Sequence, residues 1–193
     1  MTNLNLPTVE ELEQELRRVQ GRRRLRSALL RTGLSLTLVA AVAMAAALFL
    51  PVLWIQGQSM APTLIQGDVV LTVPWGELTA GEIACFQMDG KVLVRRLIAK
   101  AGDTVSIRED GRVEVNGSAL QEDYVADLNP GALDIELPLT VPEGQWFVMG
   151  DNRENAVDSR SRDMGCIPES RIESRVIARI WPFNRIGWLA GRE

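Results

Sequence analysis

The pattern of hydrophobic positions changes character along this chain of 193 residues. Near the N-terminus, Leu12, Leu16 and Val19 recur on one helical face among Glu and Arg. The preceding Thr8-Val9-Glu10-Glu11 has the Ser/Thr-x-x-Glu pattern of a helix start. We therefore expect residues 1–31 to form an arm with a short amphipathic helix, ending in an arginine-rich run.

The next segment is purely uncharged. From Thr32 to Ile55 there is no charged residue, and about 24 helical positions at ~1.5 Å each span roughly 36 Å. A bilayer core is about 30 Å thick, so 32–55 is predicted to be a transmembrane helix. Pro51 falls near its end, and Trp54 is placed like an interfacial anchor. A cleavable signal peptide would have a shorter apolar region of about 7–15 residues and a small-x-small site, which this segment lacks.

After residue 55 the helical period gives way to short runs rich in β-branched residues. Asp89-Gly90, Asp110-Gly111 and Asn116-Gly117 are strong hairpin signals between several of these runs. The expected strands are Val69–Val73, Ile83–Phe86, Val92–Val94, Val113–Val115, Trp146–Met149 and Val176–Ile180. Residues 56–193 are therefore predicted to form a mostly antiparallel β domain, anchored by the one N-terminal transmembrane helix.

The distribution of arginines predicts how the chain is oriented in the membrane. The arginine cluster before the span predicts a cytoplasmic N-terminus in the cytoplasmic (inner) membrane, with residues 56–193 extracytoplasmic. The net charge is −4, and the basic run is short and next to the membrane, so no nucleic-acid footprint is present. Cys85 and Cys166 are too few for a disulfide scaffold and lack metal-ligand spacing, although they could pair.

Candidate chemistry begins at Ser59, a few residues beyond the span. A serine hydroxyl needs an adjacent base, and this chain contains no histidine. The variant that works without histidine pairs serine with lysine, and Lys91 and Lys100 are the only lysines. Taken alone, the segment around Ser59 also fits an ordinary turn leaving a membrane.

A second polar segment follows an expected strand. Residues 150–160 read Gly-Asp-Asn-Arg-Glu-Asn-Ala-Val-Asp-Ser-Arg. So many polar residues directly after an apolar run indicate an organised loop; the alternative is an Asx-rich turn closed by Asp–Arg pairs.

With these segments the chain resembles the type I signal peptidases, the Ser–Lys peptidases of the bacterial leader peptidase type. The resemblance covers nearly everything from the span onward. Its motifs, in family order, are Gly57-x-Ser59-Met60-x-Pro62-Thr63-Leu64, Gly67-Asp68, Gly102-Asp103-Thr104-Val105, Val113-x-Val115-Asn116-Gly117, Val141-Pro142-Glu143-Gly144, Phe147-Val148-Met149-Gly150-Asp151-Asn152-Arg153, Asp158-Ser159-Arg160 and Trp181-Pro182-Phe183-Asn184-Arg185-Ile186-Gly187.

The resemblance implies a membrane-anchored serine endopeptidase that removes signal peptides from exported preproteins and needs no metal or organic cofactor. Its partners would be signal peptides and the lipid bilayer, with Trp75 and Trp146 either in the bilayer surface or in the core. Ser59 would be the nucleophile, and its own N–H would help to bind the oxyanion. The remaining implied site residues are Gly57 and Met60 at the substrate groove, and Asp151, Asn152, Arg153, Asp158 and Arg160 as loop support.

Two positions depart from the family pattern. The family's lysine base corresponds to Arg95, and a serine that orients the lysine corresponds to Ala156. Burial can bring a lysine amine close to neutral pH, whereas arginine is never deprotonated in proteins. Arg95 should therefore not act as a general base. Along a strand, Lys91 lies about 13 Å from Arg95 and Lys100 about 16 Å, so neither is at the expected position.

Two functional classes remain open. One is an active signal peptidase that uses Lys91, a neighbouring carboxylate or a water relay. The other is a non-catalytic homologue that binds signal peptides or a membrane partner without cutting them. A more distant possibility is a self-cleaving repressor-type Ser–Lys peptidase, which the membrane span and the lack of a helix-turn-helix argue against.

Overall fold

The computed structural model describes residues 26, 29–42, 44, 51–74 and 76–189. The chain divides into two compact units, Met1–Phe49 and Leu50–Glu193. The amphipathic helix expected between residues 8 and 19, and Trp75, lie outside the described residues.

In the first unit, residues 29–42 are helical and their side chains are exposed. Two hydroxyls on this helix donate to backbone carbonyls of the same helix, Ser35 to Thr32 and Thr37 to Gly33, both at 2.8 Å. Among the described residues, no helix combines the length and the hydropathy of a membrane span.

The predicted helix over 32–55 is wrong at its C-terminal end. Val52–Trp54 forms strand β1, which pairs antiparallel with β2 (Val69–Val73). The apolar content of this end is shared by helices and strands, and only the long-range pairing with β2 decides between them. Trp54 consequently lies on an edge strand, where it is largely exposed.

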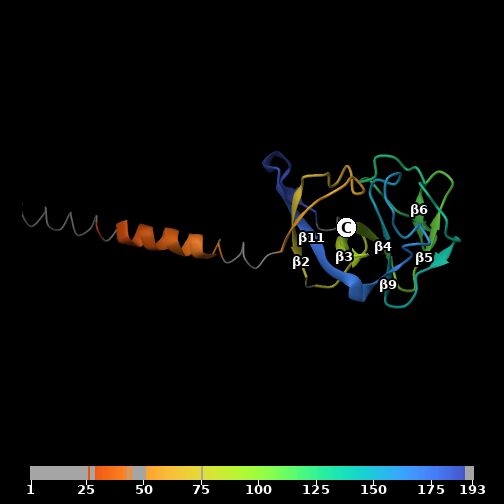
Figure 1. Ribbon diagram of the computed structural model, residues 1–193, viewed down its shortest axis with the longest axis horizontal. Coiled ribbons are helices and arrows are strands. Elements are labelled where there is room, and N and C mark those ends of the chain that lie inside the picture. The colour runs from red at the N-terminus through yellow and green to blue at the C-terminus, as the bar shows by residue number, and fades with distance from the viewer. Residues whose placement is uncertain (1–25, 27–28, 43, 45–50, 75, 190–193) are drawn as a thin grey trace, which may run out of the picture. The chain divides into compact units, whose positions relative to one another are not determined.

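The second unit contains a large antiparallel sheet (Figure 1). Its strands follow the order β1-β2-β11-β3-β4-β9-β10, and β12 pairs with β11. The bounds of the remaining strands in this sheet are β3 Ile83–Met88, β4 Lys91–Lys100, β9 Gln145–Met149, β10 Ile167–Pro168, β11 Ile172–Trp181 and β12 Gly187–Trp188.

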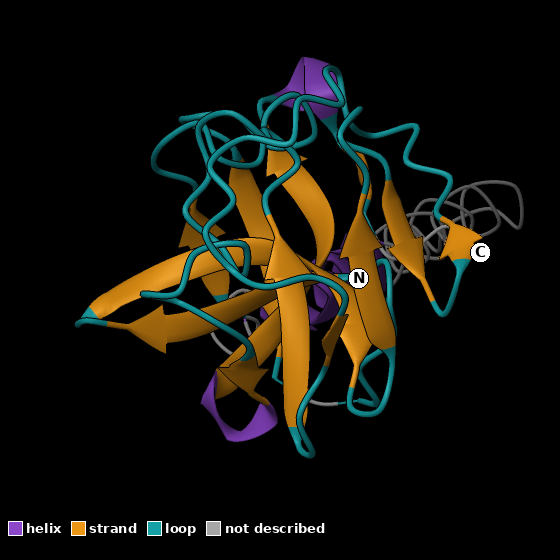
Figure 2. Cartoon of the chain, turned by 90° about the vertical axis from the view of Figure 1, so that its right-hand side faces the viewer, coloured by secondary structure: helices purple, strands orange, loops and turns teal. Residues whose placement is uncertain are grey.

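A smaller antiparallel sheet has the order β7-β6-β5-β8. Its strands are β5 Thr104–Ile107, β6 Val113–Val115, β7 Ser118–Ala119 and β8 Leu139–Thr140. Two short 3-10 helices, η1 (Glu169–Arg171) and η2 (Phe183–Arg185), flank β11, and strands and loops dominate this unit (Figure 2). Val105 and Val113 pack with Phe147 in one buried cluster, which joins the smaller sheet to β9.

The predicted mostly antiparallel β architecture is confirmed. β2 and β6 have the predicted bounds, and Asp89-Gly90 and Asn116-Gly117 both form turns with positive φ, as hairpin turns of this kind require. β4 and β11 are longer than predicted. Charged residues within them interrupt the apolar pattern, yet Arg95 and Arg96 of β4 are buried.

Candidate functional site

Ser59 lies in a turn whose neighbouring apolar side chains are buried in the core. Gly57 has φ +88°, a left-handed conformation that favours glycine, where the chain leaves β1. The turn is closed by Leu64 N–H, which donates to the Met60 carbonyl at 2.8 Å. Met60 and Leu64 are fully buried in one cluster with Ile55. Packing therefore fixes the backbone of Ser59 while its side chain stays half-buried.

Asp68 and two arginines form ion pairs and hydrogen bonds next to this turn. The buried Asp68 carboxylate pairs with Arg179 at 3.3 Å and Arg185 at 3.2 Å, and Arg179 also donates to the Thr63 carbonyl at 2.7 Å. Sequence reasoning had found Asp68 and Arg185 only as family motif positions and had missed Arg179. No local pattern reveals a partner that is 111 residues away.

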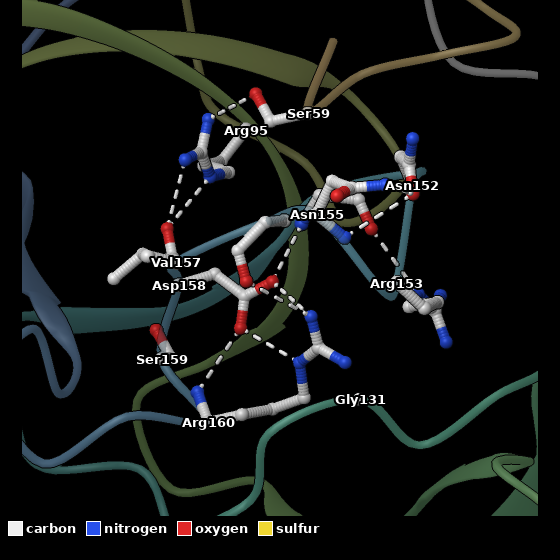
Figure 3. A network of polar contacts seen from close by, with 12 residues as sticks. Ser59, Arg95, Gly131, Asn152, Arg153, Asn155, Val157, Asp158, Ser159 and Arg160 are labelled. Atoms are coloured by element: carbon white, nitrogen blue, oxygen red, sulfur yellow. Dashed lines mark hydrogen bonds and ion pairs between the residues drawn. The ribbon is translucent and has the colours of Figure 1, made fainter.

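Arg95 is in direct contact with the candidate nucleophile (Figure 3). Its Nη1 donates to Ser59 Oγ at 2.8 Å and to the Val94 carbonyl at 2.6 Å. On the other side of the guanidinium, Nε and Nη2 donate to the Val157 carbonyl at 3.1 and 2.8 Å. The structure thus brings together Ser59 and Arg95, which are 36 positions apart.

Burial lowers the pKa of Arg95; the negative charge of Asp158 opposes this shift and the positive charge of Arg160 adds to it. A guanidinium remains protonated in proteins and offers only donors. The Ser59 hydroxyl therefore accepts a hydrogen bond at the position where a peptidase of the Ser–Lys type needs a proton acceptor.

The polar loop after β9 holds Val157 against Arg95. Asp158 accepts from Arg160 Nε and Nη2, both at 2.8 Å, and from the Gly150 N–H at 2.9 Å. Asp158 and Arg160, which the family resemblance implies as support of this loop, form a fully buried, bidentate ion pair. This pair orients the Val157 carbonyl that receives two N–H groups of Arg95.

Two further buried ion pairs support the same loop. Arg96 Nε and Nη2 donate to Asp151 at 2.8 and 2.6 Å, and Arg153 pairs with Glu122. The Tyr124 ring lies 3.8 Å from the Arg96 guanidinium carbon, a cation–π contact. Sequence reasoning named Asp151 and Arg153 but missed Arg96, Glu122 and Tyr124. Glu122 and Tyr124 fall in a loop with no pattern of its own.

Gly150 lets the loop approach Ser59 closely. A Cβ atom at Gly150 would lie 2.5 Å from the Ser59 carbonyl oxygen and 2.3 Å from the Ala156 Cβ. The Asn152 N–H donates to this same Ser59 carbonyl at 3.0 Å. Gly150 thus brings Ala156, which carries only a methyl group, close to the backbone of Ser59.

A cavity of about 400 Å³ opens beside Ser59. Its lining comes from two stretches of chain, Leu53, Trp54, Ile55, Gln56, Gly57, Ser59 and Met60 on one side and Lys91, Val92, Leu93, Val94 and Arg95 on the other. Gly57 and Met60, which the resemblance placed at the groove, both lie in this lining.

Both walls of the cavity have unpaired strand edges. β4 pairs with β3 from Lys91 to Arg96, but with β9 only from Arg96 to Lys100. Over residues 91–95, no strand in the described part of the chain pairs with the second edge. Among the described residues, β1 is the edge strand of the large sheet and pairs only with β2. An extended peptide between these edges could hydrogen-bond to the backbone on either side.

The two lysines differ in placement. Lys91 lines the cavity. Lys100 is exposed at the other end of β4, where it faces Trp146 of β9 in the register and lies outside the lining. Trp146 itself is 4% exposed and belongs to the core, so the bilayer alternative for this side chain is wrong.

Cys85 and Cys166 are both free thiols, which answers the question of their pairing. Desolvation raises the pKa of each to about 11. Within the described residues, no group of three or more His, Cys, Asp or Glu side chains could hold a metal ion.

Comparisons with known proteins agree on one family. The family model described as "Signal peptidase, peptidase S26" matches residues 28–181. A signal peptidase I of Bacillus licheniformis is 37% identical over 164 residues, covering 78% of this chain and 87% of the relative. Signal peptidase I T of Bacillus subtilis (strain 168) is 38% identical over 152 residues, covering 72% and 77%.

Among solved structures, a signal peptidase I from Enterococcus faecalis V583 has 32% sequence identity and a TM-score of 0.46, covering 52% of this chain and 97% of that one. The family match and the two Bacillus relatives are decisive. The chain belongs to the signal peptidase family, peptidase S26.

Proposed function

We propose that this chain is a signal peptidase I-type protein that binds signal peptides in the groove beside Ser59 and hydrolyses them very slowly or not at all. One observation carries the proposal. The group at the family's base position is the Arg95 guanidinium, which donates a 2.8 Å hydrogen bond to Ser59 Oγ.

Chemistry supports this reading. Attack by a serine hydroxyl requires an unprotonated base that can accept its proton. Arg95 cannot accept a proton, and its contacts with Val94 and Val157 hold it in place beside the hydroxyl. Ala156 removes the second hydroxyl that the family uses. A nucleophile and its base act as a unit, so loss of the base alone removes most of the rate acceleration that the two groups give together.

Binding is supported by the parts of the site that remain. The unpaired edge of β4 over 91–95 and the edge of β1 flank the cavity, a geometry suited to an extended peptide. Within the described residues the Ser59 N–H has no acceptor, so it is available to a peptide carbonyl. Met60 and Gly57 line the cavity, and the family resemblance implies that small side chains of the peptide would lie next to Ser59.

The proposed location is the cytoplasmic membrane. Residues 1–31 would be cytoplasmic, and the apolar segment from residue 32 to Pro51 would span the bilayer. The β domain would be extracytoplasmic and would begin at Val52, the first residue of β1, instead of at residue 56. Exposed apolar side chains on β1, β11, η2 and β12 are suited to the bilayer surface: Trp54, Trp181, Phe183, Ile186 and Trp188. A reporter fused after Glu193 should be extracytoplasmic, and a cytoplasmic reporter would refute this orientation.

A second candidate is an active peptidase with a relocated base. Lys91 supports it, because this side chain lines the same cavity as Ser59. The register places Lys91 four positions from Arg95 along β4, or about 13 Å at ~3.3 Å per residue. Loss of all Ser59-dependent cleavage in Lys91→Ala, with cleavage retained in Lys100→Ala, would favour this candidate.

Rescue tests the proposal. The detergent-solubilised double variant Arg95→Lys, Ala156→Ser should cleave a preprotein at its signal-peptide junction about a hundredfold faster than the parent chain, the scale of general-base catalysis. The same variant with Ser59→Ala is the matched control and should return to the parent level. A parent chain that already cleaves as fast as the double variant would refute the proposal. If the preprotein binds neither protein, peptide binding is refuted as well.

A further inference from the structure

Arg95 differs from the other buried arginines. Four arginines among the described residues are buried, at positions 95, 96, 153 and 160. Arg96, Arg153 and Arg160 each form an ion pair with a buried carboxylate, those of Asp151, Glu122 and Asp158. Arg95 has no ion pair in the described part of the chain, although it is only 5% exposed.

All four hydrogen bonds of the Arg95 guanidinium end on uncharged oxygens. The acceptors are Ser59 Oγ and the carbonyls of Val94 and Val157. The negative charge of Asp158 acts on Arg95 from a distance, but two N–H groups of Arg160 and the Gly150 N–H already occupy its carboxylate. A buried cation without a paired anion is costly, so this charge favours an anionic ligand.

The guanidinium also retains one donor without an acceptor among the described residues. Of its five N–H groups, Nε uses one, Nη1 two and Nη2 one in these bonds, which leaves one N–H on Nη2 without an acceptor among the described residues. Nε and Nη2 share the Val157 carbonyl, so the remaining Nη2 N–H lies on the end of the planar fork that faces away from Nε. Nη1, which is bonded to Ser59, shares this end.

The cavity beside Arg95 supplies no competing negative charge. Its lining contains two cationic side chains, Arg95 and Lys91, and no Asp or Glu. The Ser59 N–H has no acceptor in the described part of the chain, and Ser59 lines the same cavity as Arg95. The cavity thus combines positive charge with two residues that have a donor left free by the described residues, and Arg95 stands where the unpaired edge of β4 meets the first residue paired with β9.

We propose that the groove prefers peptides that end at Ser59 in a free α-carboxylate after a small apolar residue. Such a peptide is the product of signal-peptide cleavage by another peptidase, rather than an uncut preprotein. This inference rests on the proposed peptide-binding function and names its ligand class. The carboxylate would accept from the Arg95 fork and the Ser59 N–H, and charge-assisted bonds of this kind are about twice as strong as bonds to a neutral amide.

A pair of synthetic peptides tests the inference with the full chain in detergent. Both have an apolar stretch followed by Ala-Gln-Ala, and they differ only at the C-terminus, which is a free carboxylate or a carboxamide. The carboxylate form should bind about tenfold more tightly, as one charge-assisted hydrogen bond at a partly solvated site would give. The preference should shrink as salt is raised, because the added attraction is ionic.

Variants assign the preference to Arg95. Arg95→Gln should bind both peptides equally, whereas Lys100→Met, which removes a charge from the same strand outside the cavity, should keep the wild-type preference. Equal binding of the two peptides by the wild-type chain overturns the inference but leaves the proposed function standing. Binding of neither peptide refutes the proposed function itself. A preference that survives in folded Arg95→Gln refutes the role of Arg95, and the wild-type comparison decides even if that variant does not fold.

Discussion

Arg95 Nη1 lies 2.8 Å from Ser59 Oγ and donates a hydrogen bond to it. The same guanidinium holds the Val157 carbonyl through Nε and Nη2. Ser59, β4 and the polar loop after β9 are thereby joined through one side chain that cannot take up a proton.

Rescue of hydrolysis should be non-additive. Arg95→Lys alone provides a titratable amine but leaves Ala156 without a hydroxyl to orient it, and Ala156→Ser alone leaves the guanidinium in place. We expect each single variant to gain much less than the double variant in a preprotein cleavage assay, because the groups act as a unit. A full gain from Ala156→Ser alone would contradict the role assigned to Arg95.

Removing the charge of Asp158 should destabilise the domain. Asp158→Asn leaves Arg160 buried without an anion, and breaking a buried ion pair in this way costs about 3–5 kcal/mol. Urea denaturation of the full chain in detergent measures the change. Asp163→Asn is the matched control, since Asp163 is exposed in the same loop, and its effect should stay within about 0.5 kcal/mol.

A methyl group at position 150 should disturb the contact between the loop and Ser59. Gly150→Ala would place Cβ 2.5 Å from a backbone oxygen, and such overpacking costs about 1–3 kcal/mol. Gly187→Ala is the control, because no atom lies within 4 Å of its Cβ position and its φ is not left-handed. Equal unfolding midpoints for the two variants would contradict the close approach.

Both thiols should be unreactive in the folded protein. Desolvation raises the pKa values of Cys85 and Cys166 to about 11, so almost no thiolate is present at pH 8. Alkylation by iodoacetamide should be slow in buffer and fast in urea. The raised pKa values favour the folded state fully below the unfolded-state value near 9, and this contribution is lost as pH rises through 11. Rapid labelling of Cys85 at pH 8 in buffer would contradict its burial.

The sequence predicted the parts of the fold that depend on local pattern. β2 and β6 follow from short runs rich in β-branched residues, and the turns at Asp89-Gly90 and Asn116-Gly117 follow from residues that tolerate positive φ. β1 was predicted as helix because three apolar residues have no period that separates helix from strand.

Some residues of the candidate site could likewise be predicted from the sequence and others could not. Ser59 and Arg95 were found through family motifs and their departures, and Asp158 with Arg160 as what the same resemblance implies. Arg96 and Glu122 were missed because their partners lie 55 and 31 residues away, a separation that no local pattern encodes. Arg95 has no ion partner within the described residues, a property that depends on long-range contacts and therefore has no signal in the local sequence.

The most direct test of the central claim is cleavage of a preprotein by the detergent-solubilised parent chain, beside the Ser59→Ala variant. If Arg95 leaves Ser59 without a base, the two proteins should give the same negligible cleavage while both remain folded and bind the peptide. Cleavage by the parent chain that disappears in Ser59→Ala would contradict the claim and make Lys91 the first residue to test as the base.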